Sequence, residues 1–234
     1  PQLSEHSNNI SLNQELFERV KVVYDQKESA NLTPEQLVLL EKTYDSFIRS
    51  GANLKGEQKE KYRELTQKLS QLGLTYGENN LKETNNYQLV ITDEAKLAGL
   101  PESAIEAAKE TATEKGVEGW VFTLDAPSYI PLLRYAEDRE LREELYMAYN
   151  TKCTHDNEYN NLDVVKEIVN TEMAIAQLLG YNTYADYTLE KRMAENSDNV
   201  YKLLNDLIEA YKPTAIPEVA EVEALAKTTQ GADF

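Results

Sequence analysis

Apolar residues recur at helical spacing along most of this chain, which predicts a mainly α protein. A capping-box pair, Thr33 and Gln36, marks the start of one helix, and Gly51 marks its end. Pro34 fits the first helical position, where no backbone N–H is needed. One side of this helix carries the apolar stripe Leu37, Leu40, Tyr44 and Phe47.

A second helix is expected from about Gly56, with apolar residues three and four positions apart. These residues are Tyr62, Leu65, Leu69, Leu72 and Tyr76. A short link around Asn53 would fold the two helices into a long antiparallel hairpin, with Leu40 and Leu69 buried in its seam. Gly73 and Gly77 lower helix propensity, so we expect a bend or an early end there.

The middle of the chain changes to a period of two. Residues 87–92 and 120–124 have the alternation or the compact apolar run of short strands, so a small two-stranded β element is expected. Between them, residues 101–115 are rich in alanine and glutamate, which predicts a helix that ends at Gly116. Pro127 and Pro131 are expected to interrupt regular structure.

Helical signals return after the prolines. Helices are expected from Asp138 to Tyr149, from 163 to 179 and from about Tyr184 after a Thr183 cap. The last helix begins after Ser197 and should be kinked or broken by its two prolines, Pro213 and Pro217.

The pattern divides the chain into three subregions. They are a helical hairpin region at 1–86, a small β element with its intervening helix at 87–125, and a helical region at 126–234.

Charge restricts the partners. The chain has 24 basic and 41 acidic residues and a formal net charge of -17, which disfavours nucleic acid and membrane surfaces. The single Cys153 cannot form an internal disulfide, and no apolar run approaches the roughly 20 residues of a membrane span. We expect a cytoplasmic location. A periplasmic one stays open, because the chain starts at Pro1 and is expected to begin within a longer protein.

The passage from Thr92 to Asn150 combines caps, turns and aromatic residues in an order too particular for generic helices. It belongs to a set of blocks that extends along the chain. In order, they are Leu32–Gln36, Arg49–Leu54, Gly119–Asp125, Pro127–Tyr129, Arg139–Tyr149, Leu178–Tyr181, Tyr184–Tyr187 and Met193–Ala194. Together they resemble the thimet oligopeptidase and peptidyl-dipeptidase family of neurolysin-like zinc metallopeptidases. Arg49–Leu54 is more similar to the dipeptidyl carboxypeptidase branch than to the oligopeptidase A branch.

The resemblance implies a multi-helical neurolysin-like body and a parent enzyme that hydrolyses short peptides with one zinc ion. Such enzymes hold zinc with a His-Glu-x-x-His motif and a later glutamate. The only histidines here are His6 and His155, so this motif is missing, and the catalytic zinc domain is expected after residue 234. No catalytic, cofactor-binding or metal-binding residue is therefore assigned to this chain, which should be inactive alone.

In this interpretation the segment forms a wall of the substrate channel, with short peptides and the C-terminal metal domain as its partners. The alternative is a free-standing acidic helical protein-binding module that has no enzymatic activity. The reading frame after Phe234 would separate the two: a long continuation with the zinc motif favours the enzyme, and an early stop favours the module.

Two groups of residues are candidates for a functional role. Tyr181, Tyr184 and Tyr187 could line a peptide channel, because a tyrosine ring can pack and hydrogen-bond at once. The surface from Tyr184 to Tyr211 is expected to be an exposed apolar patch where the metal domain packs.

Other groups are read as structural. The run Cys153, His155, Asp156 and Glu158 is interpreted as a surface loop, since a structural zinc site needs four well-spaced ligands. The acidic pairs Glu137-Asp138 and Glu143-Glu144 lie in or beside an arginine-rich helix and are interpreted as solvated ion-pairing positions.

Overall fold

The computed structural model describes residues 2–231 and is mainly helical, as predicted, with one small two-stranded sheet. The chain forms two compact units, one up to residue 172 and one from residue 173 onward, and each is considered by itself. Within the described residues, no helix is long and apolar enough to cross a membrane. The three subregions expected from the sequence stay a prediction.

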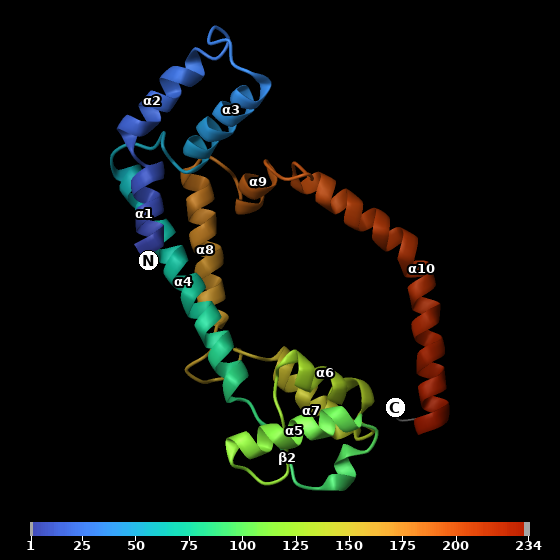
Figure 1. The fold of residues 1–234 in the computed structure, drawn as a ribbon. Coiled ribbons are helices and arrows are strands. Elements are labelled where there is room, and N and C mark those ends of the chain that lie inside the picture. Colours follow the sequence, from blue (N-terminus) through green and yellow to red (C-terminus); the bar gives the residue numbers. More distant parts are fainter. Residues whose placement is uncertain (1, 232–234) are drawn as a thin grey trace. The chain divides into compact units, whose positions relative to one another are not determined.

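Four helices form the N-terminal part of the first unit: α1 (Gln2–Ser11), α2 (Gln14–Asp25), α3 (Pro34–Arg49) and α4 (Glu57–Asn86). Helix α2 packs on α3, and α1 packs on α4 (Figure 1). The expected pairing of the helices at 34–49 and 57–86 as one antiparallel hairpin is therefore wrong.

The partner of α3 is set by aromatic side chains on α2. The rings of Tyr24 and Tyr44 stack with centroids 3.8 Å apart, and the Phe17 ring lies 5.9 Å from that of Tyr44. Phe17 is buried, whereas Leu40 and Leu69, expected in the seam, are only half-buried. Helix α3 begins with the predicted capping box, in which the Gln36 amide N–H donates to Thr33 Oγ1 over 3.3 Å.

Helix α4 continues without interruption through Gly73 and Gly77 to Asn86, so the expected early end is not found. The cost of a glycine, about 1 kcal/mol relative to alanine, is small enough to be offset by contacts elsewhere along a helix of 30 residues. Toward its C-terminal end α4 contacts the residue before helix α8 (Leu162–Leu178), where Asn79 Nδ2 donates to Asn161 Oδ1 over 2.9 Å.

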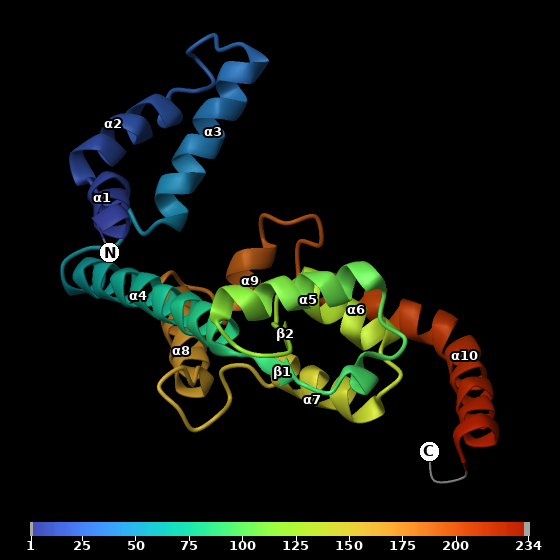
Figure 2. The same cartoon turned by 60° about the horizontal axis from the view of Figure 1, so that its bottom comes forward.

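The two predicted strands are present as β1 (Leu89–Ile91) and β2 (Trp120–Phe122). They pair antiparallel, with Leu89 opposite Phe122 and Ile91 opposite Trp120. Helix α5 (Glu102–Lys115) packs on β2, and α6 (Ala126–Tyr135) packs on α5 and on α7 (Arg139–Asn150) (Figure 2). A short 3-10 helix covers Glu94–Leu97.

This β element and its helices hold the main buried cluster. Phe122, Leu132 and Leu145 are among the largest fully buried side chains. The cluster as a whole consists of Leu89, Ile91, Leu97, Leu100, Ala108, Phe122, Leu124, Leu132, Ala136, Leu141 and Leu145.

The prediction that Pro127 and Pro131 interrupt regular structure is wrong, because both prolines lie within helix α6. Pro127 lies in the first turn, where its missing N–H has no intrahelical partner to lose. Pro131 lies inside the helix and costs one hydrogen bond. Its neighbour Leu132 is completely buried, and this burial offsets the loss.

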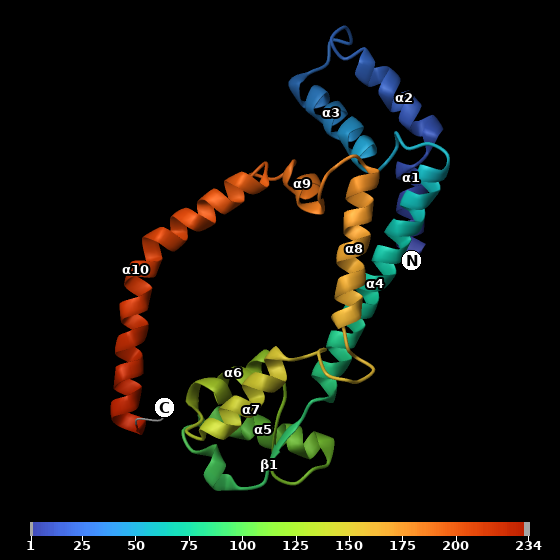
Figure 3. The ribbon, with the colours of Figure 1, turned by 180° about the vertical axis from the view of Figure 1, so that it is seen from behind.

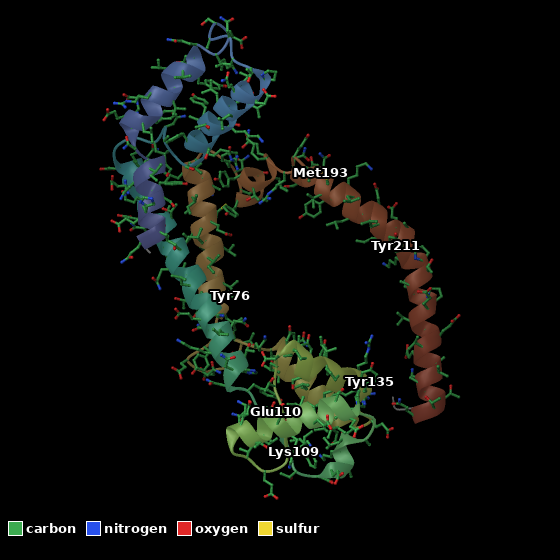
Figure 4. The ribbon with its side chains drawn as sticks, viewed as in Figure 1. Tyr76, Lys109, Glu110, Tyr135, Met193 and Tyr211 are labelled. Atoms are coloured by element: carbon green, nitrogen blue, oxygen red, sulfur yellow. The ribbon has the colours of Figure 1, made fainter. Side chains whose placement is uncertain are left out.

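Helix α8 (Leu162–Leu178) contains the division at residue 172, and it is followed by α9 (Tyr184–Leu189) and α10 (Ser197–Gln230). The predicted prolines do not break α10, but the helix bends along its length (Figure 3). The bend lies near Tyr211 (Figure 4), two residues before Pro213, which has no N–H to donate to the Glu209 carbonyl.

Candidate functional site

The three tyrosines expected to line a channel lie together on and beside α9. The ring of Tyr187 lies 5.2 Å from that of Tyr181, edge to face, and 5.8 Å from that of Tyr184. The Tyr181 hydroxyl donates to Glu190 Oε2 over 2.5 Å. All three side chains are half-buried, so each keeps one side accessible.

A capping box holds this tyrosine cluster in place. Thr183 Oγ1 accepts the Asp186 N–H over 3.0 Å, and the Asp186 carboxylate accepts the Thr183 N–H over 3.0 Å. Tyr184 and Tyr187 therefore lie one turn apart on the same face of α9, and the turn before the cap returns Tyr181 to them. The cluster offers aromatic surface and hydroxyl groups that can form hydrogen bonds.

Helix α10 carries a long exposed apolar stripe. Its members follow one another at spacings of three and four: Leu204, Ile208, Tyr211, Ala215, Val219 and Val222. None of the residues of α10 is buried, and Tyr211 and Val222 are each 67% exposed. The apolar surface expected from Tyr184 to Tyr211 is thus present, and it extends further along the same helix. Exposed apolar stripes of this length are typical of interaction surfaces.

The segment 151–161 is an ordered surface loop. The Asn161 N–H donates to the Cys153 carbonyl over 2.7 Å, and Asn160 Nδ2 donates to the His155 carbonyl over 2.7 Å. The backbone N–H of Cys153 donates to the Glu83 carboxylate of α4. Burial, with Glu83 beside it, raises the pKa of the Cys153 thiol to about 11, so the thiol stays protonated and is a poor metal ligand at neutral pH.

A zinc ion does not fit the described residues of this chain. Within residues 2–231, no three side chains of histidine, cysteine, aspartate or glutamate are grouped where they could hold a metal. His155 instead lies 3.2 Å from Thr151 Oγ1 through its Nε2.

Asp138 and Glu143, one residue from each acidic pair, lie in different environments. Asp138 caps α7 by accepting the N–H groups of Glu140 and Leu141, over 2.9 and 3.2 Å. Glu143 lines an open surface depression between α6 and α7 together with Arg139 and Arg142. Sequence reasoning placed these residues on a solvated face and missed the depression. The available signal was the spacing of Arg139, Arg142, Glu143 and Tyr146, which puts all four on one side of a helix.

Comparisons with known proteins show which family this chain is similar to. The family model described as Peptidase family M3 matches residues 132–233. Oligopeptidase A of Escherichia coli is 37% identical over 237 residues, which cover 100% of this chain and 35% of that protein. The family resemblance predicted from the sequence is confirmed: the chain is similar along its length to part of the peptidases of the M3, thimet and neurolysin-like family.

Two further relatives bear on the branch. Dipeptidyl carboxypeptidase of Escherichia coli is 30% identical, over 98% of this chain and 34% of its own length. Saccharolysin of Saccharomyces cerevisiae is 29% identical, over 99% of this chain and 33% of its own length. Identity is thus higher to oligopeptidase A, and the dipeptidyl carboxypeptidase branch expected from Arg49–Leu54 is not supported. The chain spans about a third of the length of these curated relatives.

Proposed function

We propose that this chain is part of a zinc-dependent oligopeptidase or peptidyl-dipeptidase that hydrolyses short peptides. The observation that carries the proposal is the alignment of the whole chain with proteins named as oligopeptidases and dipeptidyl carboxypeptidases. Residues 2–231 contain no group of three side chains that could hold a metal ion, so the role proposed for this part of the enzyme is in its shape and in binding.

Within that enzyme, the chain forms one wall of the substrate channel and packs against the C-terminal metal domain. The exposed apolar stripe of α10 supports this placement, because fully burying one leucine or isoleucine side chain contributes about 1.5–3 kcal/mol and α10 buries none. The half-buried rings of Tyr181, Tyr184 and Tyr187 provide aromatic surface for a peptide.

Reconstitution tests both parts of the proposal. The chain is mixed with the separately expressed remainder of its parent, and cleavage of a short fluorogenic peptide is followed with and without a zinc chelator. We expect cleavage only when both parts and the metal are present. Binding of the two parts without any cleavage would contradict the peptidase and favour the alternative, an acidic helical binding module.

Matched variants on α10 locate the interface. Replacing Leu204 and Ile208 by serine should weaken association of the two parts by about tenfold or more, because apolar side chains at the centre of an interface carry much of its affinity. The control replaces Lys202 and Asp206, an exposed ion pair of 2.7 Å on the polar side of the same helix. An equal loss of association in both variants would contradict the stripe as the contact surface.

A further inference from the structure

Helix α3 packs on α2 along one side, and its opposite side is exposed (Figure 1). Val38 is 49% exposed and Leu39 is 67% exposed, although both are large apolar residues. Leu39 borders two open hollows. One of about 490 Å³ lies between α2 and α3, and one of about 480 Å³ runs along the exposed side of α3. Helices pack on one another by fitting such ridges into such hollows.

The exposed side of α3 carries one acid and one base. Its hollow is lined by Pro34, Glu35, Val38, Leu39 and Lys42. Seven positions separate Glu35 from Lys42, which is two helical turns or about 10 Å, so both charges lie on the same side of the helix. Within the described part of the chain neither residue forms an ion pair, whereas the neighbouring Glu41 pairs with Lys27 over 2.7 Å.

Glu35 is ionised at neutral pH. Its carboxylate accepts hydrogen bonds from its own backbone N–H and from Thr33, and these hold the pKa of Glu35 below its usual value. A carboxylate has room for about four hydrogen bonds, so the group can still accept a further donor.

The order of residues on this side is complementary to itself when reversed. If two copies of α3 run antiparallel with their midpoint between Val38 and Leu39, Glu35 of each copy lies opposite Lys42 of the other. Val38 and Leu39 of both copies then lie between the two ion pairs. A parallel pairing would place like charges together. The antiparallel arrangement has the two-fold symmetry of an isologous dimer, in which both copies use the same patch.

The local charge permits this contact. Residues 14–49 carry seven acidic and five basic side chains, whereas the whole chain has a net charge of -17. Repulsion between two copies is therefore much weaker at this surface than the total charge suggests.

We infer that the exposed side of α3 is an interface between two copies of this chain, related by a two-fold axis between Val38 and Leu39. One helix from each copy buries less than the roughly 1,200 Å² of a stable interface, so the dimer should be weak and should dissociate on dilution. The interface uses no residue of α10 and does not depend on the proposed peptidase activity.

Sedimentation velocity of the intact chain between about 5 and 500 µM measures the association. The sedimentation coefficient should rise from that of a monomer toward that of a dimer. Leu39→Ser should weaken self-association by at least about tenfold, because symmetry removes two leucines from one contact. Val22→Ser is the control: Val22 is 56% exposed on α2 and lines neither hollow, so the dissociation constant should change by less than about twofold. A chain that stays monomeric throughout this range would overturn the inference.

Charge reversal tests the antiparallel register. Glu35→Lys and Lys42→Glu should each weaken self-association by at least about tenfold, because each places like charges opposite one another at two positions. Mixed one to one, the two variants should associate with each other to within about threefold of the unchanged chain, because every contact again joins an acid and a base. Glu28→Lys makes the same charge change as Glu35→Lys outside the hollow, in the link before α3, and should not weaken association. Two folded variants that fail to associate with each other would overturn the inference.

The exposed stripe of α10 is the competing surface for self-association. The double variant Leu204→Ser and Ile208→Ser removes apolar side chains from that stripe and should leave the dissociation constant within about twofold. A loss of the dimer in this variant that equals or exceeds the loss in Leu39→Ser would overturn the inference. Thermal melting by circular dichroism checks that every variant remains folded.

Discussion

Helices α7 and α10 begin in the same way and end up in different surroundings. Asp138 caps α7 and Asn196 caps α10, each by accepting backbone N–H groups of the first turn. Helix α7 then buries Leu141 and Leu145 in the main apolar cluster, whereas α10 buries no residue along its 34 residues. Both sequences carry an apolar stripe at helical spacing. Such a stripe specifies a helix with one apolar face, but it does not determine which surface packs on that face.

The comparison also shows where the stability of the chain resides. Around α7, side chains from two strands and several helices meet, and removal of any one leaves a cavity. Along α10, apolar side chains face solvent, so they contribute to stability only when another surface buries them. The region of residues 89–149 is therefore expected to set the free energy of unfolding of the isolated chain, and α10 to set its association.

The largest expected effect is at the centre of the α7 region. Leu145→Ala removes a completely buried side chain and should lower the free energy of unfolding by about 3–5 kcal/mol. Urea denaturation followed by the fluorescence of Trp120, the single tryptophan, reports this region directly. Met147→Ala on the same helix is the control: Met147 is 50% exposed, and its loss should cost less than about 1 kcal/mol. Similar losses at both positions would contradict the assigned core.

A backbone constraint in the same region should have the next largest effect. Gly99 has a φ of +85°, and a Cβ there would lie 2.2 Å from the Tyr135 carbonyl oxygen. Gly99→Ala should therefore cost about 3 kcal/mol, from the conformational strain and the clash together. Gly116→Ala, with a φ of +68° but open space around its Cβ, should cost about 1 kcal/mol. A larger loss of unfolding free energy in Gly116→Ala than in Gly99→Ala would contradict the close approach of residue 99 to the end of α6.

Removing the two helix caps tests whether the α7 and α10 regions unfold independently. Asp138→Ala and Asn196→Ala each remove a side-chain acceptor at a helix start, which costs about 1 kcal/mol locally. Only Asp138→Ala should shift the Trp120 unfolding midpoint, because α7 packs in the cluster that Trp120 contacts. Asn196→Ala should instead speed amide hydrogen exchange in the first turn of α10. A shifted Trp120 midpoint in Asn196→Ala would show that α10 and the β element unfold together.

The smallest effect is expected on the exposed stripe itself. Leu204 is 48% exposed, so Leu204→Ala should change the free energy of unfolding of the isolated chain by less than about 0.5 kcal/mol. Circular dichroism during urea denaturation measures the change. A loss above about 2 kcal/mol would mean that Leu204 is packed in the isolated chain, and the surface proposed for the metal domain would then be occupied already.

Much of the fold could be predicted because its signals are local. The Thr33 and Thr183 capping boxes, the Asp138 cap and the glycine at 116 lie within a few residues of the helix ends that they determine. The helix at 126–135 was missed because a local rule about proline was outweighed by the burial of Leu132, which depends on distant residues. The pairing of α3 was wrong for a similar reason: its stripe required a partner, and stacking with Tyr24 on α2 decided which.

The two candidate sites also differ in whether the local sequence could predict them. Tyr184 and Tyr187 could be placed on one face from their spacing alone, and the turn before the Thr183 cap brings Tyr181 to them. The depression between α6 and α7 could not be foreseen, because it requires α6 to exist and to end where Arg142 reaches its carbonyl groups.

The sequence by itself determined the helical class of this protein, most helix ends, the two strands, the family resemblance and the absence of a His-Glu-x-x-His motif. These follow from hydrogen bonds, dihedral preferences and motifs that span a few residues. Only the tertiary structure decided that α3 packs on α2 and that α10 leaves its apolar stripe exposed. It also decided that an open depression lies between α6 and α7. Those outcomes depend on which surfaces meet, and many apolar surfaces can satisfy the same pattern, so the pattern alone does not choose among them.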